Sequence, residues 1–280
     1  MQLQAALGEG SQVLRSAGVD EARLDAELLL GHVLGLERAT LLARTDRELT
    51  PKELTRYREL IGRRATREPL PYIIGRREFF GLDFAVDERV LIPRPETELL
   101  VEQALYLARR AVCPMTIADV GAGSGAIAVA LAVHLPEVAV YALDASPGAL
   151  AVTAENARRH GVAGRVHCLQ SDLLSALPVP VDLIAANLPY IAAPEWPSLP
   201  PEIREWEPRQ ALDGGPEGLD AIRRLLMQAG PCLRPGGALL LEIGSGQGAV
   251  VTALARTHLH GSIRLMQDYA GLDRLVGIYL

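Results

Sequence analysis

Residues 116–134 read TIADVGAGSGAIAVALAVH. The apolar run at 116–121 predicts a strand, and the apolar run at 125–134 predicts a helix. The three glycines between them predict a tight turn, in which the backbone can approach a ligand closely because no Cβ obstructs it. A turn that only connects a strand to a helix is the alternative. A strand, a glycine turn and a helix in this order are typical of an α/β fold.

The alternation of strands and helices extends from residue 93 to the end of the chain. Helices are expected at 96–110, 125–134, 147–160, 217–232 and 247–258. Strands are expected at 116–121, 138–143, 165–169, 181–186, 237–243, 262–268 and 274–280. These elements predict an α/β fold with an open, mostly parallel seven-stranded sheet and helices on its faces.

The first 92 residues have a different character. Residues 1–70 show helical periodicity, and Thr50-Pro51-Lys52-Glu53 predicts a capping box that starts a helix at 51–67. Tyr72–Gly75 and Phe79–Val86 look like short strands broken by glycine turns, which predicts a hairpin. We therefore expect three parts: a helical domain at 1–70, a β-hairpin linker at 71–92 and a catalytic domain at 93–280.

Composition and charge restrict the classes of function. The 280 residues are 49% hydrophobic, which suffices for one large core or two unequal ones. A formal net charge of −6 gives no indication of a surface that binds a polyanion, so no direct nucleic-acid binding is expected. Residues 51–80 nevertheless carry a local basic excess. This excess is either a solvated helix face or a docking surface for an acidic partner.

The cysteines and the apolar runs indicate where the protein works. Cys113, Cys168 and Cys232 show neither metal-ligand spacing nor a disulfide framework, so we predict free thiols and no metal site. No basic segment followed by an apolar one opens the chain, and no apolar run is long enough to span a bilayer. A cytoplasmic protein without membrane contact is expected.

A second segment has the same pattern as the first glycine turn. Both Asp119–Gly125 and Glu242–Gly248 read acid-x-Gly-x-Gly-x-Gly after an apolar strand. Each is followed, about 20 residues on, by an acid suited to ribose hydroxyls, Asp144 or Asp268. Topology separates the two, because ligands bind near the switch point of the sheet and the first turn follows the first strand. We assign ligand binding to the first turn and interpret Gly244–Gly248 as a connecting turn.

The first turn differs from the dinucleotide fingerprint, because its third glycine comes one residue early. It resembles motif I of class I S-adenosylmethionine-dependent methyltransferases, which have a Rossmann-like sheet. The resemblance implies S-adenosyl-L-methionine as cofactor and S-adenosyl-L-homocysteine as product. It also implies nine cofactor contacts: Asp119 at the methionine end, Gly121, Ala122, Gly123, Ser124 and Gly125 in the turn, Asp144 at the ribose, and Asp172 and Leu173 at the adenine.

The predicted strand at 181–186 ends in Asn187-Leu188-Pro189-Tyr190, at the edge where a parallel sheet presents catalytic groups. The Asn187 carboxamide oxygen and the Leu188 carbonyl can accept hydrogen bonds from an NH₂ group. Pro189 restricts the backbone, and Tyr190 supplies a flat face for stacking. These residues predict a catalytic clamp for an amino group on an sp² carbon, as in adenine, cytosine or a carboxamide. A simple turn after a strand is the alternative.

Three further segments resemble the HemK/PrmC-type peptide chain release factor glutamine methyltransferases. They are Leu91–Glu98 (LIPRPETE), Gly75–Gly81 (GRREFFG) and Glu207–Leu212 (EPRQAL), and the likeness extends over the whole chain. It implies a protein-(glutamine-N5) methyltransferase of translation termination, which methylates the glutamine in the Gly-Gly-Gln loop of release factors. It further implies that the helical domain recognises the substrate, and that Thr97 and Asn187 join the cofactor site. We expect a monomer.

Two other functions stay open. The commoner clamp of this family is Asn-Pro-Pro-Tyr, and the sequence Asn-Leu-Pro-Tyr found here also resembles the corresponding motif of rRNA adenine dimethyltransferases. An rRNA adenine N6-methyltransferase is therefore the competing enzyme, although the acidic charge and the LIPRPETE segment argue against it. A non-catalytic S-adenosylmethionine-binding partner of translation is the second alternative, and the complete clamp argues against it.

Overall fold

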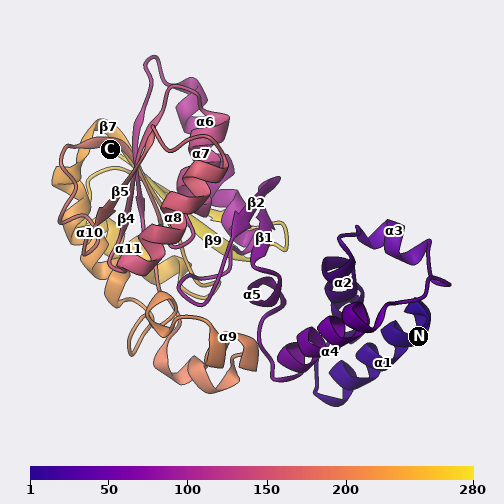
Figure 1. The fold of residues 1–280 in the computed structure, drawn as a ribbon. Coiled ribbons are helices and arrows are strands. Elements are labelled where there is room, and N and C mark those ends of the chain that lie inside the picture. Colours follow the sequence, from indigo (N-terminus) through magenta and orange to yellow (C-terminus); the bar gives the residue numbers. More distant parts are fainter. The chain divides into compact units, whose positions relative to one another are not determined.

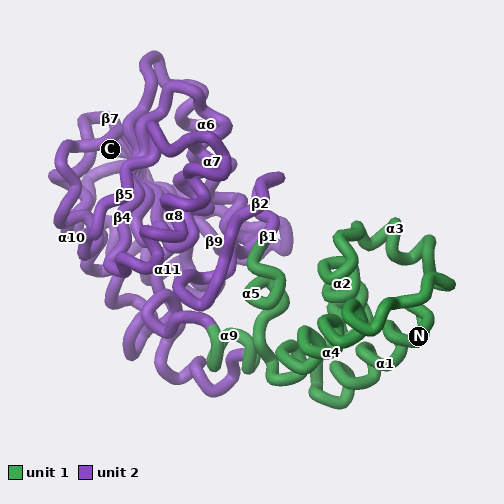
Figure 2. The backbone as a smooth tube through the Cα atoms, in the orientation of Figure 1, with its two compact units in different colours: residues 1–76, 200–206 green, residues 77–199, 207–280 purple.

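The structure, a computed structural model, describes all 280 residues (Figure 1). It divides into two compact units, which Figure 2 shows in different colours. The helical unit comprises residues 1–76 and 200–206, and the sheet unit comprises residues 77–199 and 207–280. None of the helices is both long and apolar enough to cross a membrane.

The helical unit is built around three packed helices. Its elements are α1 (Leu3–Ser16), α2 (Ala22–Leu34), α3 (Arg38–Leu42), α4 (Pro51–Ala65), α5 (Leu70–Ile74) and α9 (Pro201–Trp206). Helices α1, α2 and α4 pack against one another, and α1 buries Leu3, Leu7 and Leu14 at helical spacing. Each such leucine contributes about 1.5–3 kcal/mol by its removal from water. Burial of one apolar face per helix therefore holds the unit together.

The predicted start of α4 is confirmed. The Thr50 hydroxyl accepts a hydrogen bond from the Glu53 backbone N–H at 3.3 Å, and the Glu53 carboxylate accepts one from the Thr50 N–H at 2.8 Å. Pro51 occupies the first turn, where its missing N–H costs nothing. The helix ends at Ala65, two residues before the predicted end.

The prediction of a strand at Tyr72–Gly75 is wrong, because most of this segment is helix α5. Pro69 precedes the helix and Pro71 lies in its first turn, which are positions that favour proline. Gly75 ends it in the left-handed conformation, with φ of 79°. A short apolar run does not distinguish a helix from a strand, whereas the proline and glycine positions do. The hairpin follows as β1 (Arg76–Phe79) and β2 (Leu82–Ala85).

The basic excess in residues 51–80 is largely paired inside the helical unit. Arg64, whose side chain is 9% exposed, binds Asp25 on α2 at 2.7 Å and Glu202 on α9 at 2.9 Å. Arg67 binds the other oxygen of Glu202 at 2.6 Å. These ion pairs attach α9 to the rest of the unit. Because these arginines are paired with acids of the same unit, fewer basic side chains of residues 51–80 are available for a solvated face or a docking surface.

The Arg64 ion pairs predict a difference in stability. Arg64→Ala leaves the buried Asp25 without a counter-charge and Glu202 with Arg67 as its only cation, and should lower the free energy of unfolding of the helical unit by about 3 kcal/mol. Arg56→Ala removes only an exposed pair with Glu59 and should cost less than about 1 kcal/mol. Amide hydrogen exchange in α2 and α4 measures the loss of unfolding free energy in each variant. Equal losses in the two variants would show that the Arg64 ion pairs do not stabilise the unit more than an exposed pair does.

The sheet unit contains seven strands in the order β5-β4-β3-β6-β7-β9-β8. Their bounds are β3 (Thr116–Val120), β4 (Ala139–Asp144), β5 (Val166–Gln170), β6 (Val181–Asn187), β7 (Leu233–Glu242), β8 (Ser262–Gln267) and β9 (Asp273–Tyr279). Only β9 runs antiparallel to its neighbours β7 and β8. The predicted mostly parallel seven-stranded sheet is confirmed.

Helices cover both faces of this sheet. The helical elements of the sheet unit are η1 (Pro95–Thr97), α6 (Glu98–Arg110), α7 (Ala126–His134), α8 (Pro147–Arg159), η2 (Ala193–Ser198), η3 (Arg209–Ala211), α10 (Asp220–Cys232) and α11 (Gly248–His258). Helices α6, α7 and α8 lie on one face, and α10 and α11 lie on the other (Figure 1). The predicted helices are confirmed within three residues, except that the helix expected at 96–110 begins as the separate turn η1.

The strand order places the site. From β3 the chain continues to β4 and β5 on one side, whereas β6 and β7 lie on the other side. At such a switch point the connections leave in opposite directions, which opens a crevice at the carboxyl ends of the strands. The first glycine turn follows β3, and Asn187 is the last residue of β6. Both therefore border the same crevice.

Candidate active site

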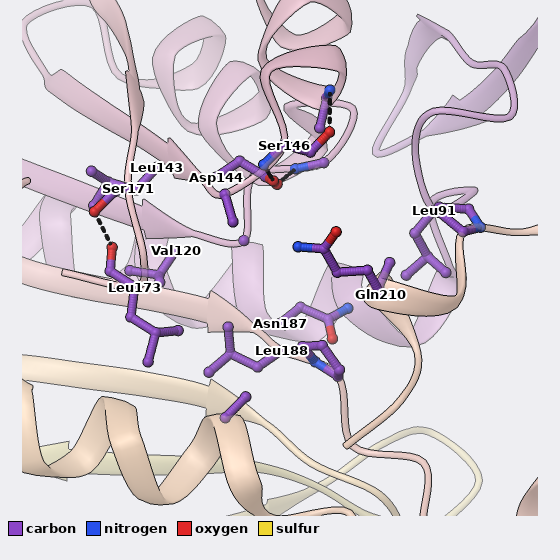
Figure 3. Close-up of a pocket in the computed structure, with 18 of the residues that line it drawn as sticks. Leu91, Val120, Leu143, Asp144, Ser146, Ser171, Leu173, Asn187, Leu188 and Gln210 are labelled. Carbon is purple, nitrogen blue, oxygen red and sulfur yellow. Dashed lines mark hydrogen bonds between the residues drawn. The ribbon is translucent and has the colours of Figure 1, made fainter. Parts of the chain in front are cut away.

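A cavity of about 270 Å³ lies at the carboxyl ends of β3, β4 and β6 (Figure 3). Its apolar walls include Val120 and Leu143. Eight of the residues predicted from the sequence line it, namely Gly121, Gly123, Asp144, Asp172, Leu173, Asn187, Leu188 and Pro189. No group of His, Cys, Asp and Glu side chains able to hold a metal ion is present.

The glycine turn gives the cavity an open backbone surface. Gly121 has φ of 79°, and a Cβ there would lie 3.2 Å from the Asn187 carbonyl oxygen, so the turn packs closely against the end of β6. Gly123 has φ of 56°, and the nearest atom to a Cβ there would be the Gly121 oxygen at 3.9 Å. The side of Gly123 that borders the cavity is therefore free for a ligand.

Asp144 connects the glycine turn to α8. Its Oδ2 accepts a hydrogen bond from the Gly123 N–H at 2.9 Å, and its Oδ1 accepts one from the Ser146 N–H at 2.8 Å (Figure 3). A carboxylate offers about four lone-pair sites, so about two remain for a ligand. This geometry suits a pair of neighbouring hydroxyl groups on the cavity side.

The turn after β5 supplies the far wall of the cavity. The Asp172 carboxylate forms an ion pair with Arg224 on α10, so a ligand amino group would share this carboxylate with the guanidinium. Leu173 has a positive φ of 52°, and the Ser171 hydroxyl donates a hydrogen bond to its carbonyl oxygen at 2.8 Å (Figure 3). The strained turn holds the Leu173 side chain against the cavity.

Six predicted residues do not line the cavity: Thr97, Asp119, Ala122, Ser124, Gly125 and Tyr190. Asp119 is fully buried, and one of its oxygens accepts a hydrogen bond from the Ala128 N–H on α7 at 2.9 Å. Its other oxygen has no hydrogen-bond partner. Burial raises the pKa of Asp119 to about 7. In this position the carboxyl group holds the start of α7 and so supports the turn from below.

The clamp residues are fixed by different contacts. The Asn187 Nδ2 donates a hydrogen bond to the Thr97 hydroxyl at 3.1 Å, which leaves Oδ1 free to accept one. The Leu188 side chain is buried in the core and anchors its backbone. Burial, with the nearby Glu242 as the next cause, raises the pKa of Tyr190 to about 12, so this phenol stays neutral.

The second glycine turn has a task that the sequence did not reveal. Gln247 donates hydrogen bonds through Nε2 to the carbonyl oxygens of Tyr190 at 3.0 Å and Gly218 at 3.1 Å, and its Oε1 accepts one from the Gly244 N–H at 3.0 Å. This turn connects β7 to α11 and also holds the clamp backbone. The Asp268 carboxylate is used in a different place, where it accepts backbone hydrogen bonds near β9.

Glu207 is a second residue that sequence reasoning missed. Its side chain is 1% exposed, forms an ion pair with Arg94 and accepts a hydrogen bond from the Ile92 N–H at 3.2 Å. Burial raises the pKa of this carboxyl group, although Arg94 acts to lower it. The pair joins the LIPRPETE segment to the EPRQAL segment. Only the three-dimensional contact shows why both segments carry charge.

Comparisons with known proteins cover nearly the whole chain. Residues 5–75 match the family model described as PrmC N-terminal domain, and residues 96–196 match the one described as Methyltransferase small domain. The release factor glutamine methyltransferase of Moorella thermoacetica is 50% identical over 98% of this chain and 97% of its own length. That of Geobacter sulfurreducens is 46% identical over 94% of this chain and 92% of its own.

Solved structures agree on the fold. The T. thermophilus 16S rRNA N2 G1207 methyltransferase, solved in complex with AdoMet and guanosine, has a TM-score of 0.53 and 16% identity. The match covers 73% of this chain and 49% of that one, and at this identity it shows the class I methyltransferase fold alone. The Moorella and Geobacter proteins are far more similar to this chain in sequence, and the matches cover nearly the whole of each of them. The chain belongs to the family of release factor glutamine methyltransferases.

Proposed function

We propose that this chain is a protein-(glutamine-N5) methyltransferase that methylates the glutamine of the Gly-Gly-Gln loop in release factors. The observation that carries the proposal is the Asn187 carboxamide, whose Nδ2 is occupied by Thr97 while the residue borders the cavity beside Leu188. Two hydrogen-bond acceptors at one wall match the two hydrogens of a primary amide. The name of the relatives gives the class of substrate.

The residues of the cavity fit S-adenosyl-L-methionine. When bound, this cofactor supplies an electrophilic methyl group and leaves as S-adenosyl-L-homocysteine. Gly121 and Gly123 offer bare backbone, and Asp144 retains lone pairs for the ribose hydroxyls. Asp172 and Leu173 offer a carboxylate and an apolar wall for the adenine. Ala122, Ser124, Gly125 and Asp119 support the turn from behind, and we assign them this indirect role.

The clamp promotes attack by the substrate amide nitrogen, a poor nucleophile, because it holds this nitrogen in a fixed orientation. An amide nitrogen is weakly nucleophilic because its lone pair is delocalised into the carbonyl group. Asn187 Oδ1 and the Leu188 carbonyl accept its two hydrogens, which fixes the nitrogen and stabilises the positive charge that develops on it. Pro189 keeps this backbone rigid, and the Tyr190 side chain packs against the core outside the cavity, where it supports the clamp. The surplus proton leaves to water after transfer, without a protein base.

A protein substrate agrees better with the charge than an RNA substrate does. The chain has a net charge of −6, and its local basic excess is paired with its own acids in the helical unit. An RNA enzyme would need unpaired basic side chains to neutralise phosphates. We infer a monomeric, cytoplasmic enzyme whose helical unit recognises the release factor and which binds no nucleic acid directly.

One experiment tests the reaction and its substrate together. The purified chain is incubated with methyl-labelled S-adenosyl-L-methionine and a purified release factor, and the product is digested and mapped by mass spectrometry. We expect a single added methyl group on the glutamine of the Gly-Gly-Gln loop, and none when that glutamine is replaced by alanine. Label in added rRNA instead would support the adenine enzyme. Cofactor binding without any transfer would support a non-catalytic partner.

A further inference from the structure

One buried carboxyl group near the cavity has no task in the chemistry described so far. Glu242 is the last residue of β7 and is 1% exposed. Neither of its oxygens has a hydrogen bond of ordinary distance and angle. A buried polar group without a full partner costs about 1–3 kcal/mol, and more when it is charged. A cost of this size calls for a function.

Glu242 and the clamp lie side by side on the sheet. Asn187 and Glu242 are register partners on the adjacent parallel strands β6 and β7. Their side chains therefore leave the same face of the sheet. Helix α6 packs on this face against both strands, and Thr97 immediately precedes the first residue of this helix. Thr97 is 4% exposed and Glu242 is 1% exposed, so these two side chains are shielded from water, whereas Asn187 borders the cavity.

The Thr97 hydroxyl connects the other two groups. It accepts the hydrogen bond from Asn187 Nδ2 at 3.1 Å, and the Glu242 carboxyl group, whose two oxygens have no other partner, lies near enough to accept the single hydrogen of this hydroxyl. A hydroxyl group has only one hydrogen. When Glu242 takes that hydrogen, Thr97 has only lone pairs to offer Asn187. Asn187 must then present its NH₂ group to Thr97 and its oxygen to the cavity.

We propose that Glu242 and Thr97 are positioning residues that fix the orientation of the Asn187 carboxamide through this chain of hydrogen bonds. The proposal rests on the proposed function, because the oriented oxygen is the acceptor for the substrate amide. An ionised Glu242 allows only one order of donors, from Asn187 to Thr97 to Glu242. A neutral group with its own hydrogen also allows the reverse order. The Asn187 NH₂ group would then face the NH₂ group of the substrate.

The surroundings of Glu242 make its charge sensitive to pH. Burial raises the pKa of Glu242 to about 7, and the Thr97 hydrogen bond and the Arg274 charge act to lower it. Arg94 also lowers it and Glu96 raises it. Tyr190 faces the group as a neutral phenol, and Arg274 is shared with Asp268 at 3.1 Å. Because the ionised form is the ordering one, kcat should fall as the pH drops through about 7.

The test compares variants that keep the shape and change the hydrogen bonds. Thr97→Val removes the hydroxyl, and we expect its kcat to fall about 10- to 100-fold. Thr97→Ser keeps the hydroxyl and should retain at least ten times the kcat of Thr97→Val. The Kd of S-adenosyl-L-methionine, measured by calorimetry, should stay within about threefold in both. Equal kcat values for Thr97→Val and Thr97→Ser would overturn the proposal.

The pH profile separates positioning from mere stability. Wild-type kcat should decrease by up to about tenfold in all as the pH falls through the Glu242 pKa, and should level off at the value of the neutral form. Glu242→Gln removes the charge at nearly the same shape, so its kcat should be about tenfold lower at pH 8 and flat between pH 6 and 8. Infrared difference spectra between these pH values should show a carboxyl band that Glu242→Gln lacks. An unchanged acid limb in Glu242→Gln would overturn the proposal.

Failure of the proposed function gives a different result. If the wild type transfers no methyl group to a release factor, the assignment of the reaction fails, whatever the variants do. If the wild type is active and the Thr97 and Glu242 variants match it in kcat and pH profile, only the positioning chain fails. If Glu242→Gln does not fold, the comparison of Thr97→Val with Thr97→Ser still decides.

Discussion

Asn187→Ala should lower kcat for methyl transfer by about 10²- to 10³-fold, because it removes one of the two acceptors that hold the substrate amide. The cavity loses part of one wall, while the glycine turn and the Asp144 carboxylate stay in place. The Kd of S-adenosyl-L-methionine should therefore change by no more than about threefold. Single-turnover kinetics with a release factor and calorimetry with the cofactor measure the two values separately.

Asn187→Asp is the matched variant. It keeps an oxygen at the cavity but loses the NH₂ group that donates to Thr97. We expect its kcat to lie well below the wild-type value, since the replaced carboxylate is no longer held in one orientation. A variant at this position with near-normal kcat would show that the amide is held by other groups. Asn187 would then not be an acceptor for the substrate amide, although the chain would still belong to its family.

Asp144→Ala should raise the Kd of S-adenosyl-L-methionine by about 10- to 100-fold. The substitution removes the lone pairs proposed for the ribose and also frees the N–H groups of Gly123 and Ser146, each of which is worth about 1.5–3 kcal/mol as a bond to a charged acceptor. Asp268→Ala is the control, because Asp268 occupies the equivalent place after the second glycine turn. Its carboxylate serves backbone groups at Ala270 and Leu272.

The two glycine turns make this a direct comparison. We expect Asp268→Ala to leave the Kd within about twofold, measured by calorimetry under identical conditions. If Asp268→Ala instead raises the Kd of S-adenosyl-L-methionine and Asp144→Ala leaves it unchanged, the cofactor binds at the second turn. We expect both variants to keep the sheet intact, since neither side chain belongs to a buried apolar cluster. The comparison therefore reports binding and not folding.

The sheet could be predicted from sequence because each buried parallel strand is a short apolar run with turn residues at its ends. Its main error in length concerns β7, which begins at Leu233 and not at 237. Pro235, Gly236 and Gly237 are typical of a turn, yet they extend the strand irregularly beside β6. Local composition is therefore a weak guide where a neighbouring strand fixes the backbone.

The site could be predicted only as far as its residues follow strand ends in the sequence. Asp144 and Asn187 end β4 and β6, so parallel pairing brings them to one edge. Thr97 lies in the LIPRPETE segment and Glu242 begins the second glycine motif, but their proximity depends on how α6 packs over β6 and β7. Glu242 in particular begins the second glycine motif, where its position matches that of Asp119 in the first. The sequence does not show that Glu242 is buried beside the clamp.

Helix α9 has a consequence for how the protein is made. Residues 200–206 complete the helical unit, yet they lie more than 120 residues beyond its other members in the chain. On the ribosome, the first 76 residues emerge long before Glu202, so Arg64 and Arg67 must wait for their counter-charge. The unit is therefore no independent module that could be excised or exchanged at a single cut. Its final form depends on synthesis of the chain through β6 and the clamp.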